Sequence, residues 1–249
     1  MTTDLMTRSG PFPEWQERTI QLYGEEKFAR LQEANILVAG LGGVGSMAAE
    51  MICRNGVRKM TLIDGDTIQP GNINRQLPAT HKTLRREKAL VMGERLKEIN
   101  PGLDLTVLHE FLKEERIPEL LETPFDYVVD AIDTLSPKIY LIYHSVHAGR
   151  KLASSMGSGG KVDPAQIRVA DFGDTYNCRL AYILRKKLRK LDVHGGFKVV
   201  FSTEQVPKEM IIPVEGEPNK KSTVGTNSYI PAIFGCFLAS IVIRDLVGE

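Results

Sequence analysis

Four closely spaced glycines are the feature of this sequence that most directly indicates chemistry. They lie in the run GLGGVG, between a short β-rich run at residues 35–39 and a helical pattern. Backbone N–H groups at the start of a helix can face a phosphate, and glycine leaves no side chain in its path. We therefore expect a nucleotide phosphate to bind here; the alternative is a turn that needs glycine only for close packing of helix on strand. The four candidate residues are Gly40, Gly42, Gly43 and Gly45.

An acidic side chain ends the next β-rich run and adds a second part of a nucleotide site. Asp64 stands where a carboxylate accepts hydrogen bonds from the hydroxyls of an unmodified ribose. By themselves these two features would suggest NAD. The segment after Asp64, however, is rich in charged and amide side chains. A reaction that breaks the bond between two phosphates of a nucleotide needs such groups to stabilise the negative charge that develops on the α-phosphate and on the departing pyrophosphate. These side chains are Asp66, Asn72, Asn74, Arg75, Gln76, Arg85, Arg86 and Lys88.

A further carboxylate indicates a metal site. Asp133 follows an apolar strand at 127–129, and the carboxyl end of a parallel strand faces the ligand crevice of such folds. Asp130 lies just before it and is either a second ligand or a cap for the next element; we favour Asp133. Magnesium is the expected ion, because it combines a few carboxylates with phosphate oxygens.

The elements around these residues alternate between strand and helix. Residues 35–64 fit a strand, a tight turn, a helix and a second strand, which is one βαβ unit with parallel strands. The alternation continues and predicts an α/β fold with a doubly wound, mainly parallel sheet. Further expected strands are 103–108, 127–130, 152–156 and 166–171, and further expected helices are 87–100, 114–122, 138–148 and 178–191.

The chain is expected to form a single domain over residues 1–249. Residues 1–30 would form an N-terminal arm and helix, and residues 176–228 a basic, loop-rich segment, with loops dominating 195–225. The apolar run 229–247 contains charged residues and is predicted to be a core helix, with peripheral membrane contact as the minor alternative.

Composition argues against several classes of protein. The 249 residues are 42% apolar, enough for a sizeable core, and 32 Lys and Arg against 31 Asp and Glu leave a net charge of +1. Three cysteines without a Cys-x-x-Cys pair exclude a disulfide framework and a four-cysteine zinc site. Together with the lack of a secretory leader, this predicts a cytoplasmic protein. Cys178 is expected to be reachable, and Cys53 and Cys236 to lie in the core.

A local cluster of positive charge interrupts the overall balance. Six Lys or Arg residues lie between Arg179 and Lys190, which is either a surface for RNA phosphates or an ordinary solvated helix face. The candidate tRNA-binding residues are Arg185, Lys186, Arg189 and Lys190, and Lys208, Lys220 and Lys221 would extend this patch.

Several motifs, in order and spacing, resemble the E1-like adenylating superfamily, which includes the ThiF, MoeB and HesA proteins and the ubiquitin-activating enzymes. They are GLGGVGS, the aspartate of LIDGD, NINRQ, the lysine of REKA and the aspartate of DAID. Within that superfamily the chain most resembles the tRNA threonylcarbamoyladenosine dehydratases, through LYGEEKFARLQEANILVAG, GSGGKVDPAQIRVADFGDT and VVFSTE. The resemblance implies a Rossmann-like fold of the ThiF type.

This resemblance also implies a role for each candidate residue. Asp64 would hold the ATP ribose with Asp66 close by, and Asp133 would bind magnesium. Gly42 and Gly43 would line the approach of the phosphates. Arg18 would reach the phosphates of the neighbouring protomer, so a homodimer is implied as a condition of catalysis. The residues implied to contact nucleotide and phosphates are Asn72, Arg75, Gln76 and Lys88, and those implied to be catalytic are Arg18, Arg75, Lys88 and Asp133.

The implied reaction is an ATP-dependent dehydration. The carboxylate of N6-threonylcarbamoyladenosine in tRNA would attack the α-phosphate of ATP, and pyrophosphate would leave. The carbamoyl group would then close a ring with release of AMP, so no protein nucleophile is required. The alternative is adenylation of the C-terminus of a ubiquitin-like sulfur carrier protein, and the missing zinc cysteines favour the dehydratase.

Two positions depart from the dehydratase pattern. Ser136 stands where some members have arginine, and Lys198 or Val199 stands where some have cysteine, which argues against a thioester at that strand. The phosphate-binding side chains disfavour an NAD-dependent oxidoreductase, and the retained Arg75, Lys88 and Asp133 disfavour a catalytically silent module. The sequence leaves open whether a cysteine desulfurase or another sulfur-acceptor system is a partner.

Overall fold

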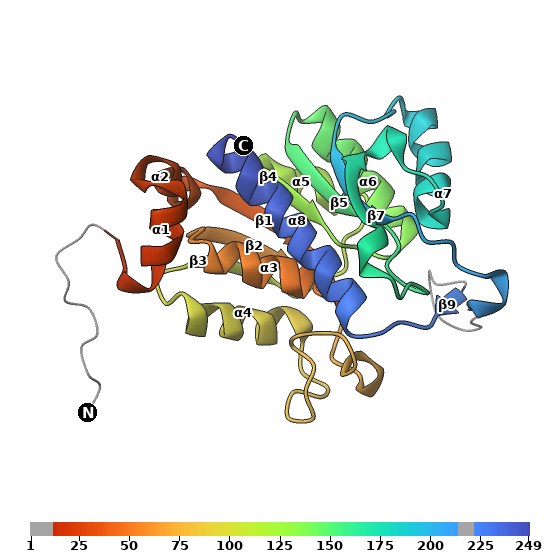
Figure 1. Ribbon diagram of the computed structural model, residues 1–249, viewed down its shortest axis with the longest axis horizontal. Helices are drawn as coiled ribbons and strands as arrows, with labels where there is room; N and C mark the ends of the chain where they lie inside the picture. Colours follow the sequence, from red (N-terminus) through yellow and green to blue (C-terminus); the bar gives the residue numbers. More distant parts are fainter. Residues whose placement is uncertain (1–11, 214–221) are drawn as a thin grey trace.

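Short apolar runs form the strands of one seven-stranded sheet in the computed structural model, which describes residues 12–213 and 222–249 (Figure 1). The strand order is β3-β2-β1-β4-β5-β7-β6, and every neighbouring pair is parallel except β6 with β7. This confirms the predicted mainly parallel sheet. The strands are β1 (Asn35–Ala39), β2 (Lys59–Ile63), β3 (Asp104–Leu108), β4 (Tyr127–Asp130), β5 (Lys151–Ser155), β6 (Ile167–Asp171) and β7 (Lys198–Ser202), and β8 (Ile211–Pro213) with β9 (Ser222–Val224) forms a separate hairpin.

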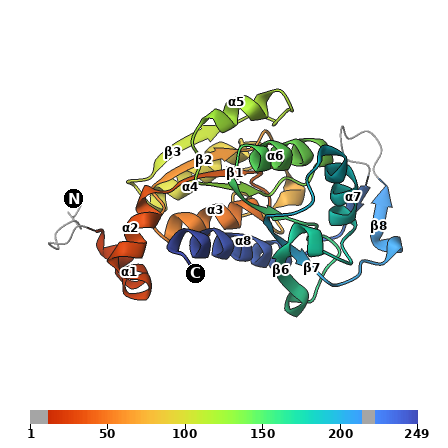
Figure 2. The ribbon, with the colours of Figure 1, turned by 90° about the horizontal axis from the view of Figure 1, so that it is seen from above.

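Helices cover both faces of the sheet, because successive side chains of a buried strand point to opposite sides. Ile36 and Val38 of β1 pack in one core cluster with α2, α3, α4 and α8, whereas Leu37 and Ala39 pack in the other with α5, α6 and α7. Figure 2 shows α5 and α6 on one side of the strands and α3 and α8 on the other. The helices are α1 (Glu17–Tyr23), α2 (Glu25–Glu33), α3 (Gly45–Arg54), α4 (Lys88–Ile99), α5 (Arg116–Glu122), α6 (Leu135–His147), α7 (Arg179–Leu188) and α8 (Tyr229–Val247).

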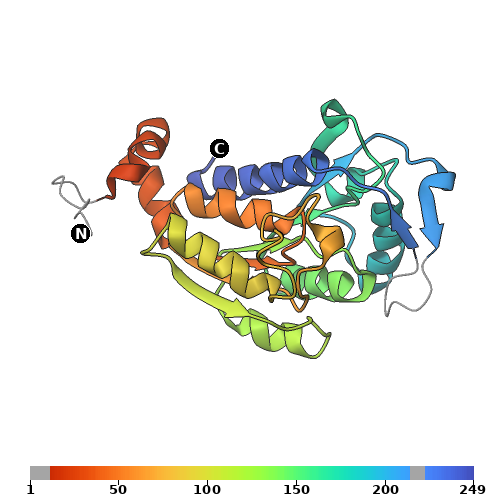
Figure 3. The ribbon, with the colours of Figure 1, turned by 90° about the horizontal axis from the view of Figure 1, so that it is seen from below.

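Helix α8 lies along α3, which in turn packs against α4 (Figure 3). Its Gly235 is required by this contact, since a Cβ there would come within 2.4 Å of the Val44 carbonyl oxygen. By length and composition α8 is the one helix in the described ranges that could cross a membrane, but 56% of its apolar window is buried inside the protein. The predicted core helix is therefore confirmed.

Two segments differ from the expectation. The N-terminal part has two helices, because Gly24, with a φ of 80°, breaks the chain between α1 and α2; residues 1–11 of the expected arm lie outside the described part. The segment 195–225 is not all loop, because it contains β7, a buried strand that lies between β5 and β6. Its apolar run is too short to show a periodicity of its own.

The cysteine expectations were wrong for two of the three residues. Cys178 is 6% exposed, with its side chain turned toward Gly157, and it belongs to the core formed by α6 and α7. Cys236 is exposed on α8, whereas Cys53 is buried as expected. Helix α8 is apolar on every side, so the sequence alone does not tell which of its faces is covered.

Candidate active site

Three candidate segments meet at the carboxyl ends of adjacent strands. The glycine loop follows β1, Asp64 follows β2 and Asp133 follows β4, and β1 is hydrogen-bonded to both of its neighbours. The chain leaves β1 toward β2 and β3 and then returns to the other side of β1 as β4. Ligands of doubly wound folds bind at such a switch point, because the helices on the two sides diverge there and leave a crevice.

Three of the four loop glycines are required by the protein itself. Gly40 has a φ of 87°, and a Cβ on Gly45 would overlap the Gly40 carbonyl oxygen. Gly43 lies against Pro231 and the backbone of Arg75. Gly42 is different, because a Cβ there would have no neighbour closer than the Gln76 amide nitrogen at 3.6 Å. Packing alone therefore explains three glycines, and the fourth keeps open the space in front of α3.

Asp64 is held directly beneath this loop. One carboxylate oxygen accepts a hydrogen bond from the Leu41 N–H at 2.6 Å, and the other accepts one from the Asp66 N–H at 2.8 Å. Burial raises the pKa of Asp64, and the positive charge of Lys88 opposes this shift. Each oxygen keeps a free lone pair, so the carboxylate can also accept hydrogen bonds from ribose hydroxyls.

Lys88 already has a charged partner in this structure. It is 4% exposed at the first position of α4, and its ammonium lies 2.7 Å from the Asp66 carboxylate. The backbone N–H of Lys88 donates to the Asp66 carbonyl, which ties the two residues together. A phosphate approaching Lys88 would therefore share or replace Asp66, which is a solvent-exposed carboxylate.

The segment after β2 places its polar groups beside the glycine loop. Arg75 donates to the Gly71 carbonyl and to Asn74, both at 2.8 Å, and burial lowers its pKa while the charge of Asp133 opposes this shift. Gln76 is buried, and its side-chain oxygen has no hydrogen-bond partner among the described residues. A buried polar atom without a partner is unfavourable, so it indicates a position for a bound ligand or water.

Other side chains of this segment have partners of their own. Asn72 accepts a hydrogen bond from the Gln69 N–H at 2.9 Å and caps a short 3₁₀ turn, and Asn74 donates to the Thr226 carbonyl. Arg86 pairs with Glu94 on α4 rather than with the loop. The predicted group of phosphate-binding side chains is therefore smaller than the sequence suggested.

The structure distinguishes the two aspartates that follow the apolar strand. Asp130 and Lys138 are both fully buried and form an ion pair of 2.7 Å, and Asp130 also accepts hydrogen bonds from Ser154 and the Ile132 N–H. Lys138 in turn donates to the Ile132 carbonyl. Asp133 is exposed, and within the described part of the chain no hydrogen bond or ion pair engages its carboxylate. Asp130 therefore holds the turn, and Asp133 remains available for a ligand.

Two further residues near Asp64 have no counterpart among the sequence candidates. Phe111 is exposed although it is a large aromatic residue, and it lies against Gly65, where a Cβ would come within 2.6 Å of its ring. His109 lies within 3.2 Å of the Asp64 carbonyl oxygen through its Nδ1 atom. A single phenylalanine after a strand has no sequence signal that separates it from a core residue.

The other candidates lie away from this crevice. Arg18 is exposed on α1, which lies beyond the amino ends of the strands (Figure 1). The candidate tRNA-binding residues Arg185 and Lys186 lie on α7, and Arg189 and Lys190 lie in the 3₁₀ turn that follows it (Arg189–Leu191). Lys186, Arg189 and Lys190 are exposed, whereas Arg185 is partly buried and contacts Thr175. Lys220 and Lys221 lie outside the described residues.

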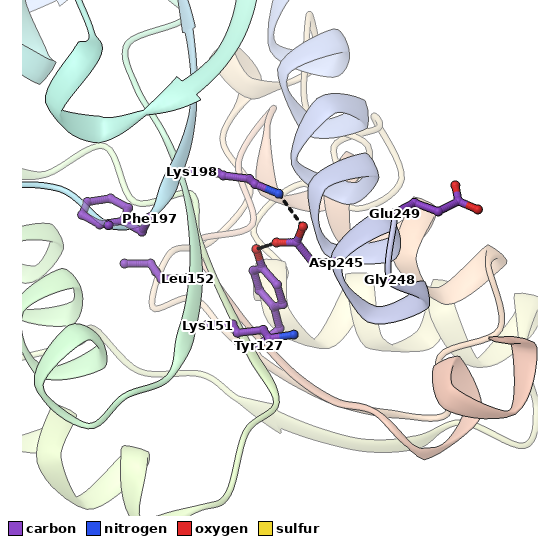
Figure 4. A pocket seen from close by; sticks show the side chains of 9 residues that line it. Tyr127, Lys151, Leu152, Phe197, Lys198, Asp245, Gly248 and Glu249 are labelled. Atoms are coloured by element: carbon purple, nitrogen blue, oxygen red, sulfur yellow. Dashed lines mark hydrogen bonds and ion pairs between the residues drawn. The ribbon is translucent and has the colours of Figure 1, made fainter.

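A cavity of about 450 Å³ opens at the opposite edge of the sheet (Figure 4). It lies at the amino ends of β4, β5 and β7, where Asp245 accepts a hydrogen bond from Tyr127 at 2.8 Å and pairs with Lys198. Burial raises the pKa of Tyr127, and the bond to Asp245 adds to this shift. None of the predicted nucleotide-binding residues lines this cavity, so we place the active site at the glycine loop.

Comparison with known proteins shows what the chain is similar to. Residues 16–249 match the ThiF family. The tRNA threonylcarbamoyladenosine dehydratases of Bacillus subtilis and Escherichia coli are 34% and 39% identical to the chain over 91% and 94% of its length, and the matches cover 92% and 95% of theirs. The crystal structure of the E. coli enzyme TcdA in complex with ATP superposes with a TM-score of 0.85 at 33% identity, covering 93% of each chain.

A relative that acts on a sulfur carrier protein is more distant. The sulfur carrier protein ThiS adenylyltransferase of E. coli is 31% identical, but the match covers only 57% of this chain and 56% of that protein.

The buried ion pair yields a stability prediction. Lys138→Met should destabilise the protein by about 3–5 kcal/mol, because it leaves the Asp130 carboxylate buried without a counter-charge. Urea unfolding followed by circular dichroism measures this change, with Lys151→Met as a control because Lys151 is exposed at the start of β5. Replacing both partners, as in Asp130→Leu with Lys138→Met, should recover part of the loss. A Lys138→Met variant as stable as the control would contradict the assigned role of the pair.

Proposed function

The chain belongs to the ThiF family, and we propose that it catalyses the ATP-dependent dehydration of N6-threonylcarbamoyladenosine in tRNA, releasing AMP and pyrophosphate. The observation that carries this proposal is the near full-length likeness to dehydratases of that name, one of them solved with ATP. The crevice at the switch point supplies the groups that such a reaction needs. These groups are the glycine loop, the carboxylates of Asp64 and Asp133, and the cations Arg75 and Lys88.

The chemistry proceeds by activating a carboxylate. A carboxylate oxygen of the threonyl group attacks the α-phosphorus of ATP, and the bond to pyrophosphate breaks. A nitrogen or oxygen of the carbamoyl group then attacks the acyl carbon, and AMP leaves with the original carboxylate oxygen. The net change is loss of one water from the nucleoside while ATP becomes AMP and pyrophosphate. The enzyme supplies position and charge and no nucleophile, which agrees with the burial of Cys178.

Each residue of the crevice has a task in this scheme. Asp64 accepts hydrogen bonds from the ribose, and the space kept open by Gly42 lets the phosphates approach the first N–H groups of α3. Arg75 and Lys88 carry the positive charge that meets the phosphates. The unpartnered oxygen of buried Gln76 accepts a hydrogen bond from the nucleotide or its bound water. Asn72 supports the turn that presents Arg75 and Gln76.

The residues present fit a magnesium ion held together with phosphate oxygens. No cluster of three or more potential ligand side chains occurs in the described ranges, so this part of the chain offers no complete metal cage. The free carboxylate of Asp133 is the kind of single protein ligand that magnesium combines with phosphates and water. Bound there, the ion would neutralise negative charge on the phosphates.

We also propose a homodimer in which Arg18 acts on the partner's nucleotide. Helix α1 lies at the amino ends of the strands and the crevice at their carboxyl ends, so Arg18 of one chain is far from its own site (Figure 1). Trp15 and Leu22, which lie near Arg18, are 45% and 74% exposed. In the proposed dimer, the partner chain would cover these two side chains.

The basic face of α7 supports tRNA as the substrate. Lys186, Lys187, Arg189 and Lys190 are exposed, and in the ranges 12–213 and 222–249 none of them forms an ion pair. Free cations that are not neutralised within the protein are available for RNA phosphates.

Adenylation of a sulfur carrier protein remains the second candidate function, because it shares the first chemical step. The partial match to the ThiS adenylyltransferase and the lack of a reachable cysteine at the crevice make it the weaker one. The substrate assay below separates the two.

The first prediction concerns the reaction and Asp133. With ATP, magnesium and tRNA bearing N6-threonylcarbamoyladenosine, the protein should release AMP and pyrophosphate, and mass spectrometry of the nucleosides should show the loss of one water. Asp133→Ala should reduce the rate of AMP release by about 10²-fold or more, since it removes the carboxylate proposed to hold the ion that neutralises the phosphates. Asp104→Ala, which removes an exposed carboxylate at the start of β3, is the control. Turnover that requires a sulfur carrier protein in place of tRNA would support the second candidate.

The second prediction tests the contribution of Arg18 in trans. Arg18→Ala and Lys88→Ala should each be inactive, but a mixture of the two should regain up to about a quarter of the activity, because one heterodimer site has both residues intact. The measurement is AMP release after subunit exchange, which differently tagged chains can verify. Verified exchange without any recovery would mean that Arg18 does not act across the interface.

The third prediction concerns the cations of α7. The triple variant Lys186→Gln, Arg189→Gln and Lys190→Gln should weaken tRNA binding and flatten its salt dependence by about one unit of slope for each lost phosphate contact. Arg185 is left unchanged because it contacts Thr175. ATP affinity, measured on the same protein, should not change. Unaltered tRNA affinity and slope would identify this helix face as ordinary solvated surface.

A further inference from the structure

Helix α7 presents an aromatic ring in the middle of its basic face. Arg179, Tyr182 and Lys186 follow one another at spacings of three and four residues, which places them along one side of the helix. Arg189, three residues after Lys186, begins the 3₁₀ turn that continues the helix. The opposite side, Ala181, Leu184 and Leu188, is buried in the core shared with α6. The stripe therefore consists of three cations and one tyrosine that all face away from the protein.

The side chain of Tyr182 is largely exposed and pairs with no other aromatic ring of the described residues. It is 62% exposed, and its ring belongs to none of the aromatic pairs found among the described residues. Tyr176, which is also exposed just before α7, does have such a partner, because its ring meets Phe201 edge to face at 5.5 Å. An exposed ring without a partner, set among cations that are also free, is suited to a ligand with both flat apolar faces and negative charge.

The direction of α7 orients this stripe relative to the active site. Cys178, which precedes α7, lies near Gly157 at the end of β5, and β5 pairs with β4, which leads to Asp133. The helix thus starts at the edge of the sheet that carries the crevice, packs beside α6 and leads toward β7, whose amino end lies at the opposite edge. With a rise of about 1.5 Å per residue, Arg189 lies roughly 10 Å beyond Tyr182. Tyr182 is therefore closer than Lys186 and Arg189 to the edge of the sheet that carries the crevice.

We infer that Tyr182 stacks on an unpaired base of the substrate tRNA next to the reacting adenosine, while the cations beyond it hold the flanking phosphates. This inference rests on the proposed dehydratase function. The reacting nucleoside must leave its base stack to bring its carboxylate into the crevice, which exposes the faces of neighbouring bases. Bases within an RNA duplex are already stacked on both sides, so a side chain can stack only on unpaired bases. The kind of partner is therefore a single-stranded loop rather than a helical stem.

The experiment compares three single variants with the unmodified protein in titrations of modified tRNA at several salt concentrations. Tyr182→Ala should weaken binding about tenfold at every salt concentration and leave the slope unchanged, because stacking releases no counterions. Tyr182→Phe, which keeps the ring, should bind as the unmodified protein does. Lys186→Gln is the matched control on the same helix face and should lower the slope by about one unit. The affinity for ATP should be equal in all four proteins.

A second measurement identifies the RNA element. An RNA hairpin with the modified adenosine in its loop should bind Tyr182→Ala more weakly than it binds the unmodified protein. A duplex made from the stem alone should bind these two proteins equally. Equal binding of the hairpin by Tyr182→Ala and the unmodified protein would overturn the inference, and so would a Tyr182→Phe variant as weak as Tyr182→Ala. If the unmodified protein dehydrates the tRNA, either result removes only the stacking role. If it does not, the proposed function itself is wrong.

Discussion

The arrangement of this protein depends on one close backbone contact at the end of β1. The chain turns from strand to helix so tightly that a Cβ on Gly45 would lie 1.8 Å from the Gly40 carbonyl oxygen, and one on Gly40 would lie 2.8 Å from the Ala131 carbonyl oxygen. These contacts bring the start of α3 directly over the ends of β1 and β4. Helix α8 then packs on α3 through Gly235, again without a side chain between the backbones. The crevice exists because nothing larger than hydrogen stands at these positions.

Electrostatics divides the carboxylates around this crevice into different roles. Asp130 is buried and fully partnered, so it stabilises the turn after β4 and leaves Asp133 free. Asp64 is held by two backbone N–H groups and keeps lone pairs for a ligand. Asp66 neutralises Lys88 until a more strongly charged group competes for it. Removal of either partner of the buried Asp130–Lys138 pair would leave an uncompensated charge, which is strongly destabilising.

The sheet separates the functions of the molecule between its two edges. The crevice and the start of α7 share the carboxyl edge, whereas α1 with Arg18 lies beyond the amino edge (Figure 1). Arg18 and the crevice thus lie at opposite edges of one chain, and the proposed dimer rests on this separation. In that proposal, tRNA and the partner chain would contact different surfaces of the molecule.

The sequence by itself determined the βαβ unit of residues 35–64, the glycine turn, the position of Asp64 and the resemblance to the family. These features depend only on the spacing of residues within short segments. The sequence also favoured Asp133 over Asp130, but the physical reason for that choice, the pairing of Asp130 with Lys138 and Ser154, is visible only in the structure. The burial of Cys178, the exposure of Cys236, the contact of Arg185 with Thr175 and the strand β7 inside the sheet were likewise decided by tertiary structure. Periodicity shows which residues of a helix or strand share a face, but the face that is covered depends on neighbours far away in the chain.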